Sequence, residues 1–323
     1  MPIQDTDFLT ATMVVRALER KLFDRDRTAR LCDARSDDEA LRLLAECGYE
    51  VPAMTVRGLE EALGKARKDV YRLLGESFQG GYAVILDVFR VLTDYHNVKA
   101  MIKGGGELLI DLGRIPVKEL LEADFIRLPG VIGKAARDAK ELLIRTGDPQ
   151  SSDFLLDRAC LGEMLSLAEE SESTFLLGYV RLYIDVYNLR SLVRAQRIGR
   201  GPDYVRLILA PGGSVGLTRL VSALQSGAQV GEVFSQTPLA AAAEAGVSAS
   251  RGEGGLTAFE KLCDDALNRY ARMGRAVAFG EQPLIGYLLE REAEMTMLRT
   301  VIGGRLGGVP SGQIKERLRA AYG

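Results

Sequence analysis

The sequences DYHNVKAMIKGGG (residues 94–106) and DVYNLRSLVRAQRIGRG (residues 185–201) begin with the same pattern, 91 residues apart. In both, an aspartate is followed three residues on by an asparagine, then by a branched apolar residue and a basic residue. A weaker third copy begins at Glu294, 109 residues after the second, with Met297 in place of the asparagine and Arg299 as the base. A pattern that recurs about every 100 residues predicts three related structural units.

Each copy has the spacing of an α-helix. Asp94, Asn97, Val98, Met101 and Ile102 would share one helix face, because residues three, four, seven and eight apart lie on the same side. Each copy then reaches glycine, the residue that most readily adopts the left-handed conformation beyond a helix end. The pattern therefore predicts long helices, the first from about 80 to 103, with an acid and an amide on the apolar side.

A carboxylate on an apolar face needs a partner, because burying an unpaired charge is costly. For Asp94 and Asp185 we expect either an arginine or the free N–H groups of a neighbouring helix end. Bracing of one helical bundle against another is the favoured role, and direct ligand binding is the alternative. The basic residues lie on a different, solvated face, and the arginines at positions 181–206 could meet an acidic partner. The candidate structural or interface residues are Asp94, Asn97, Lys99, Lys103, Asp185, Asn188, Arg190, Arg194, Arg197, Glu294, Arg299 and Arg305.

Upstream of each copy, an apolar residue is followed by charged residues: Leu59-Glu60-Glu61, Leu156-Asp157-Arg158 and Phe259-Glu260-Lys261. The repeat is too long for a solenoid of helix pairs, so three similar helical bundles are expected. We place them at residues 1–107, 108–206 and 207–323.

The remaining segments also favour an all-α fold. Residues 8–23 predict a helix with Phe8, Val15, Leu18 and Leu22 along one side and Met13 near the edge of that side. A capping box is expected at the start of the next helix, with the Ser36 hydroxyl accepting an N–H of the first turn and the Glu39 side chain accepting the N–H of Ser36. Gly48 is expected to end that helix. Residues 204–211 are ambiguous between helix and strand, and residues 239–255 predict a helix end followed by a mobile loop.

Composition and short sequence features argue against several classes of function. Lys and Arg number 42 against 44 Asp and Glu, so the chain has no overall basic character for nucleic acid. The four scattered cysteines and single histidine do not form a plausible zinc set, and buried reduced thiols are expected. The start of the sequence lacks the features of a signal peptide, and no apolar run is long enough to span a bilayer. The acidic cluster at Asp37 and Asp38 fits a helix N-terminus better than a magnesium site.

The chain resembles the C subunit of the bacterial and archaeal V/A-type ATPases, the counterpart of the d subunit of the eukaryotic vacuolar proton pump. The resemblance covers essentially the whole chain. It rests on ATMVVRALERKLFDRDRTARL near the start, on TDYHNVKAMIKG and YIDVYNLRSLVRA, and above all on the stretch from Phe279 to Gly323. Met297 departs from the asparagine that the first two copies have.

The resemblance implies a funnel-like, pseudo-threefold helical protein that has no active site and binds no cofactor. Such a protein would join the central stalk, made of the D and F subunits, to the membrane proteolipid ring and turn with the rotor. It would lie in the cytoplasm, peripheral to the inner face of the cell membrane, which it would contact only through its partners. The alternatives from the residues alone are a metal-dependent helical enzyme and a nucleic-acid-binding helical scaffold.

Overall fold

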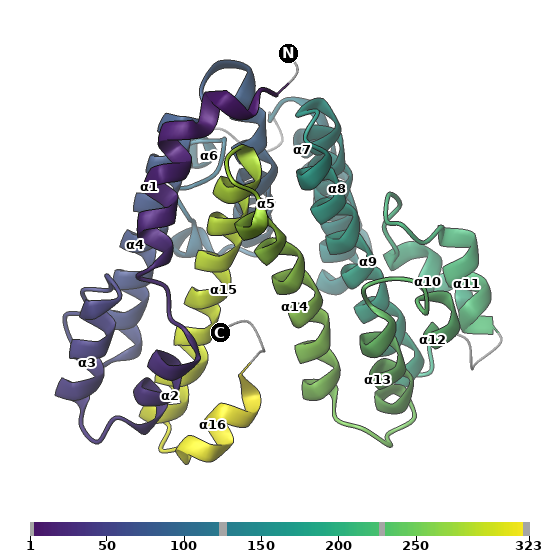
Figure 1. Cartoon of the computed structure of the whole chain (residues 1–323). Helices are drawn as coiled ribbons and strands as arrows, with labels where there is room; N and C mark the ends of the chain where they lie inside the picture. Colours follow the sequence, from purple (N-terminus) through teal and green to yellow (C-terminus); the bar gives the residue numbers. More distant parts are fainter. Residues whose placement is uncertain (1–2, 123–127, 226–229, 319–323) are drawn as a thin grey trace. The chain divides into compact units, whose positions relative to one another are not determined.

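The computed structural model describes residues 3–122, 128–225 and 230–318, and these residues form helices and connecting loops without a strand (Figure 1). The all-α prediction is therefore confirmed for the part of the chain that is described. The chain divides into two compact units: a middle unit, Phe78–Phe259, and a terminal unit that combines Pro2–Ser77 with Glu260–Gly323. The two ends of the chain thus fold together in one unit.

The terminal unit is built around one long helix, α15 (Glu281–Leu306), against which α1, α2, α4 and α16 pack. α15 is buried along most of its length because almost every turn carries a large apolar residue. The other elements of this unit are the 3-10 helices η1 (Asp5–Phe8) and η5 (Met273–Ala276) and the helices α1 (Leu9–Glu19), α2 (Arg25–Asp33), α3 (Asp37–Glu46), α4 (Val56–Ser77), α16 (Ser311–Arg317) and most of α14 (Leu256–Arg272).

The core of the terminal unit joins residues from both ends of the sequence. Leu31, Leu44 and Leu63 from the first part pack in one apolar cluster with Leu298 and Val301 of α15. Burial of a leucine contributes about 2 kcal/mol to stability, so this shared core holds the two ends of the chain together.

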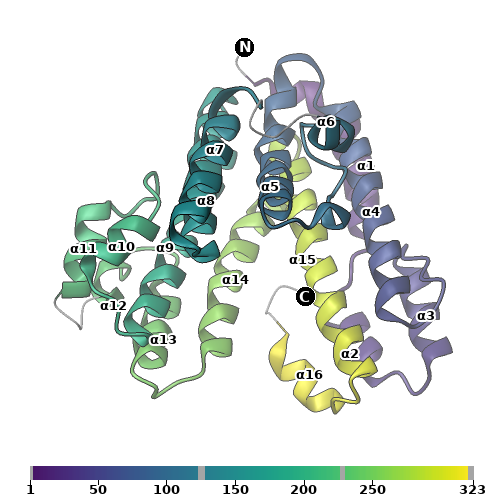
Figure 2. The ribbon, with the colours of Figure 1, turned by 180° about the vertical axis from the view of Figure 1, so that it is seen from behind.

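The middle unit contains two long motif helices, α5 (Ala83–Ile102) and α9 (Thr174–Arg197), with α8 (Pro149–Glu170) packed against both (Figure 2). α7 (Gly130–Thr146) lies alongside α8, and α13 (Ala240–Ser250) packs on α9. The smaller elements are η2 (Gly80–Tyr82), η3 (Gly106–Leu108), α6 (Val117–Glu122), α10 (Pro202–Ile208), α11 (Leu217–Gln225), α12 (Val230–Val233) and α13 (Ala240–Ser250).

Several local predictions are confirmed. Residues 83–102 form a single helix, close to the predicted range. Ser36 caps α3, because its hydroxyl accepts the N–H of Glu39 at 3.2 Å, and Gly48 follows the helix with a φ of +87°. The return bond of the capping box differs by one residue, since the Glu39 carboxylate accepts the N–H of Arg35 at 2.8 Å instead of that of Ser36. All four cysteines are buried, and none forms a disulfide within the described part of the chain.

Two local predictions need correction, and one segment that was left ambiguous between helix and strand is resolved. The first helix ends at Glu19, and Met13 is 74% exposed, so it does not belong to the buried side with Phe8, Val15 and Leu22. Most of residues 239–255 is helix α13, because six alanines in this stretch favour a helix over a loop. The ambiguous segment 204–211 belongs largely to helix α10.

Candidate functional site

In three places the acid of a motif helix contacts a loop, and we call these loops the closing loops. Closing loop 1 (residues 110–115) contacts Asp94 of α5, closing loop 2 (residues 210–215) contacts Asp185 of α9, and closing loop 3 (residues 20–24) contacts Glu294 of α15. Each closing loop runs directly into a helix: α6, α11 and α2 respectively. Each motif acid therefore fixes the loop that leads into a following helix.

In closing loop 1, Asp94 is completely buried and accepts two hydrogen bonds from the loop. The Nε of Arg114 donates at 2.9 Å and the N–H of Ile115 donates at 3.1 Å. Asn97 pairs with the peptide groups of Ile110 in both directions, since its Nδ2 donates at 2.9 Å and its Oδ1 accepts at 2.8 Å. The acid fixes one end of the loop and the amide fixes the other.

Closing loop 2 repeats this arrangement with a different side chain beside the acid. Asp185 accepts the N–H of Ser214 at 3.0 Å, the N–H of Val215 at 3.3 Å and the hydroxyl of Ser214. Asn188 pairs with the peptide groups of Ala210, with both distances 2.8 Å. The serine hydroxyl thus stands where an arginine stands in closing loop 1.

Closing loop 3 comes from the other end of the sequence. The N–H of Phe23 donates to Glu294 at 2.5 Å, and the Tyr49 hydroxyl donates at 2.6 Å. Arg291, one turn before Glu294 on α15, donates to it at 2.5 Å and lies over the Tyr49 ring. In all three loops the backbone donor lies two residues before the next helix begins. The third motif is therefore completed by the start of the chain.

The structure gives a physical reason for Met297. In closing loops 1 and 2 the residue five positions before the backbone donor offers its peptide groups to an asparagine. The corresponding residue before Phe23 is Leu18, which lies within α1, and its carbonyl already accepts the N–H of Lys21 at 2.9 Å. Since no free peptide group needs a partner there, an apolar side chain is favoured, and Met297 is 1% exposed in the core.

Two glycines allow closing loops 1 and 2 to approach the acids. A Cβ added to Gly113 would lie 2.1 Å from Oδ1 of Asp94, and one added to Gly213 would lie 2.2 Å from Oδ1 of Asp185. Neither oxygen can move away without losing its backbone hydrogen bond. The third acid is a glutamate, one methylene longer, and the matching loop position is Lys21.

The electrostatics of the three acids are dominated by burial. Burial raises the pKa of Asp94, Asp185 and Glu294 above their ordinary values, and the hydrogen bonds described above oppose that rise only in part. Burial also raises the pKa of the Tyr49 hydroxyl, and the neighbouring Glu294 adds to the effect. The oxygens are occupied by internal donors, so this arrangement suits a fixed structural cap.

The basic residues of the motifs form ion pairs with neighbouring helices. Lys99 pairs with Asp157 at 2.5 Å, and Lys103 pairs with Asp153 at 2.6 Å. Arg299 donates to both oxygens of Glu60, at 2.7 and 2.9 Å.

These pairs follow an order that sequence reasoning missed. Asp157 and Glu60 are the charged residues found upstream of the second and first copies of the motif. The base of the first copy thus pairs with the acid before the second copy, and the base of the third copy pairs with the acid before the first. Both partners of each pair belong to features that repeat in the sequence: the base belongs to the motif, and the acid belongs to the charged residues upstream of a motif copy. Sequence reasoning found both features and did not link them.

The remaining candidate residues lie elsewhere: one arginine is near the end of α2, and three are on α9. Arg305 donates to the carbonyl of Ala34 at 2.8 Å and thereby caps the end of α2. Arg190 is partly exposed, and Arg194 and Arg197 are exposed near the end of α9, where cations suit the helix dipole. Within residues 3–122, 128–225 and 230–318, no group of three His, Cys, Asp or Glu side chains is placed to hold a metal ion.

Comparison with known proteins identifies the family. The model of the ATP synthase (C/AC39) subunit family matches residues 12–317. The chain belongs to this family. The C subunit of the V-type sodium ATPase of Enterococcus hirae is 23% identical, over 96% of this chain and 97% of the relative. The C subunit of the A-type ATP synthase of Desulfurococcus is 26% identical over 94% and 88%, and that of the V-type ATP synthase of Thermus thermophilus is 23% identical over 86% and 88%.

The resemblance inferred from the motifs is therefore confirmed, and the family is one of subunits of rotary ATPase complexes. Among the described residues, none of the helices combines the length and the hydropathy that a membrane-spanning helix requires.

Proposed function

We propose that this chain is a non-catalytic central-stalk subunit of a V/A-type rotary ATPase. It joins the D and F subunits of the stalk to the membrane proteolipid ring and transmits torque between them, as a peripheral protein at the inner face of the cell membrane. The observation that carries the proposal is the family match over residues 12–317, since the relatives are C subunits of such complexes.

The closing loops support a rigid, pseudo-threefold adaptor. Three motif acids hold three loops, and the third loop comes from the start of the chain, so the repeats follow one another in a cycle. We accordingly propose three bundles related by a pseudo-threefold axis, which form a funnel or socket, with sequence boundaries near residues 107 and 206. A protein that transmits torque needs such internal bracing, because loops that are not held in place would deform under the torque instead of passing it on.

Native mass spectrometry tests this proposal. The chain is mixed with the D–F stalk pair of its own organism, with and without the solubilised proteolipid ring. We expect a complex that contains one copy of this chain with the stalk pair and gains mass when the ring is added. Absence of both complexes would contradict the proposal, and metal binding by calorimetry and nucleic-acid binding would then test the two alternative classes.

A further inference from the structure

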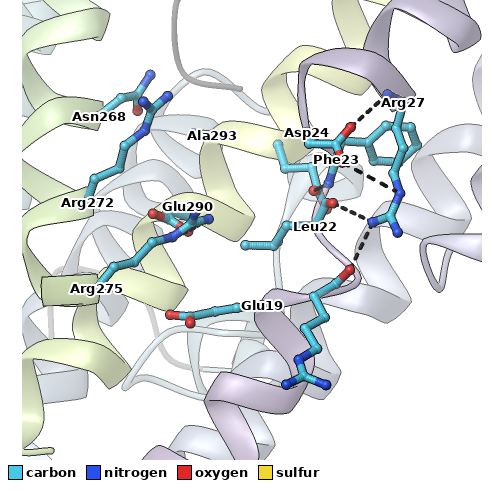
Figure 3. Close-up of a pocket in the computed structure, with 12 residues that line it drawn as sticks. Glu19, Leu22, Phe23, Asp24, Arg27, Asn268, Arg272, Arg275, Glu290 and Ala293 are labelled. Carbon is cyan, nitrogen blue, oxygen red and sulfur yellow. Dashed lines mark hydrogen bonds and ion pairs between the residues drawn. The ribbon is translucent and has the colours of Figure 1, made fainter. Parts of the chain in front are cut away.

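The terminal unit contains a cavity of about 220 Å³ beside closing loop 3, and the charges of its lining balance (Figure 3). Four acids and four arginines line it, and two of the arginines lie beside acids of the lining: Arg27 beside Asp24 at 4.0 Å and Arg275 beside Glu290 at 2.9 Å. A cavity with balanced charges favours neither an anion nor a cation. The surface of the middle unit differs in this respect.

The middle unit carries an excess of positive charge where α8, α9 and α10 meet. This patch, which we call the arginine surface, consists of Arg158, Arg197 and Arg200 with the apolar residues Ile198 and Leu207. Ile198 is 59% exposed and Leu207 is 66% exposed. Arginine is enriched in protein–protein interfaces, and exposed apolar residues that lie together mark surfaces that partners cover.

Contacts between the helices show that these residues form one surface. The guanidinium of Arg200, which lies between α9 and α10, stacks over the ring of Tyr204 at 5.2 Å. The same ring meets Phe154 of α8 edge-on, with 6.1 Å between the ring centres. Arg158, one turn further along α8, donates to the carbonyl of Leu207 at 3.1 Å. The arginines of α8 and of the α9–α10 connection therefore lie on the same side of the unit.

The positive charges of the arginine surface are not neutralised by neighbouring acids. Across the part of the chain that the structure describes, none of its three arginines forms an ion pair. The acids on the adjoining turns already have other partners, since Asp157 pairs with Lys99 at 2.5 Å and Asp203 pairs with Arg206 at 2.9 Å.

One further acid, Asp148, lies near the surface at the start of α8. Hydrogen bonds from Ser151 and Gln150 lower the pKa of Asp148, and the charge of Arg200 lowers it further. Asp148 can offset one of the three positive charges, so the arginine surface keeps a net positive charge and fits an acidic partner.

We propose that the arginine surface docks the D–F stalk pair, on a patch where carboxylates surround apolar side chains. This inference rests on the joining role proposed above and names the face that meets the stalk. Guanidinium groups bind carboxylates through paired hydrogen bonds, so the arginines fix the orientation of the stalk pair. Ile198 and Leu207, which are exposed in the isolated chain, are buried against the apolar part of that patch.

The sign of the charge selects the stalk rather than the ring. Loops of membrane proteins on the inner side of the membrane carry an excess of lysine and arginine. A proteolipid ring would therefore present positive charge to the proposed adaptor, and like charges brought together across an interface are costly. The soluble stalk pair is not subject to this bias.

Isothermal titration calorimetry of the full chain with the D–F pair of its organism tests the surface. We expect the wild type to bind the pair and the affinity to fall as the salt concentration rises, because the contact is between opposite charges. The double variant Arg197→Glu/Arg200→Glu should bind the pair at least about tenfold more weakly and should keep the melting temperature of the wild type, since both residues are exposed.

The matched control is Arg219→Glu, which makes the same kind of charge change at an exposed position of α11. α11 follows closing loop 2, which is anchored at Asp185, about 18 Å along α9 from Arg197. This variant should bind the stalk pair like the wild type. A second variant, Ile198→Ser/Leu207→Ser, removes apolar area without a change of charge and should weaken binding about threefold or more.

The outcomes separate this inference from the joining role. If the wild type binds the stalk pair and Arg197→Glu/Arg200→Glu binds it equally well, the arginine surface is not the docking face and the joining role stands. If the wild type does not bind the pair, both proposals fail. Loss of ring binding in the double variant with stalk affinity retained would overturn the choice of partner. Cosedimentation with phosphatidylglycerol vesicles that the double variant loses, again with stalk affinity retained, would assign the surface to anionic lipid and likewise refute the proposal.

Discussion

Asp185 shows how one buried residue supports a whole loop. It accepts the N–H groups of Ser214 and Val215, whereas Arg200 is exposed and lies over the Tyr204 ring. We predict that Asp185→Ala lowers the free energy of unfolding by about 2–4 kcal/mol, because two backbone donors lose their acceptor. Arg200→Ala should lower it by about 1 kcal/mol or less. Urea denaturation of both variants measures the difference, and equal losses would contradict the assigned role of Asp185.

The same residue predicts a pH dependence. Burial raises the pKa of Asp185 in the folded protein above its unfolded value, so the folded state binds this proton more tightly. Its contribution to stability is therefore fully present below the unfolded pKa and is lost as pH rises through the folded pKa. Asparagine does not titrate, so the stability of the wild type relative to Asp185→Asn should fall as pH rises from about 4. Urea denaturation at several pH values measures this difference, and a rise with pH would show that the hydrogen bonds outweigh burial.

At the scale of elements, the closing loops depend on two glycines that leave room for the acids. We predict that Gly113→Ala and Gly213→Ala each destabilise the protein by about 1–3 kcal/mol, because the new methyl group would overlap an acid oxygen held by hydrogen bonds. Gly216→Ala, in the same region as Gly213, adds a methyl group with nothing within 4 Å and should be nearly neutral. Thermal unfolding compares the three variants, and equal effects at positions 213 and 216 would refute the steric explanation.

The motif helices could be predicted from sequence, and the closing loops could not. The spacing of Asp94, Asn97 and Val98 is enough to place an acid and an amide on the apolar face of a helix, and all three are buried. The backbone partner of the acid lies 21 residues downstream in the first repeat and 30 residues downstream in the second, in loops without periodicity. For Glu294 the backbone partner lies 271 residues away, and no local pattern indicates it.

The sequence pattern also could not show which apolar residues of the first helix are exposed. Met13 fits the helical stripe of residues 8–23 by its chemistry, and only the end of α1 at Glu19 and its packing against α15 decide which side is buried. The alanine-rich segment 239–255 suggested a loop because of its glycines, whereas its first part has the composition of a good helix.

At the scale of the whole molecule, the two chain ends belong to one cooperative unit. Tyr49 and Glu294 are 245 residues apart in sequence and share a buried hydrogen bond of 2.6 Å. A double-mutant cycle with Tyr49→Phe and Glu294→Gln should give a coupling free energy of about 1–2 kcal/mol. The control cycle pairs Tyr49→Phe with Arg57→Gln, where additive effects are expected because Arg57 is exposed. Additive effects in both cycles would mean that Tyr49 and Glu294 do not stabilise the unit together.

The proposed role makes a further prediction for the assembly as a whole. A protein that links the stalk to the ring without chemistry of its own should be needed for coupling and dispensable for ATP hydrolysis. The measurement is made on proteoliposomes that contain the complete rotary ATPase of the source organism, assembled with and without this chain, with ATP hydrolysis and ion uptake followed together. We predict that omission of the chain abolishes ATP-driven ion uptake while hydrolysis by the detached catalytic part continues. Ion uptake that persists at the full rate without this chain would contradict the account.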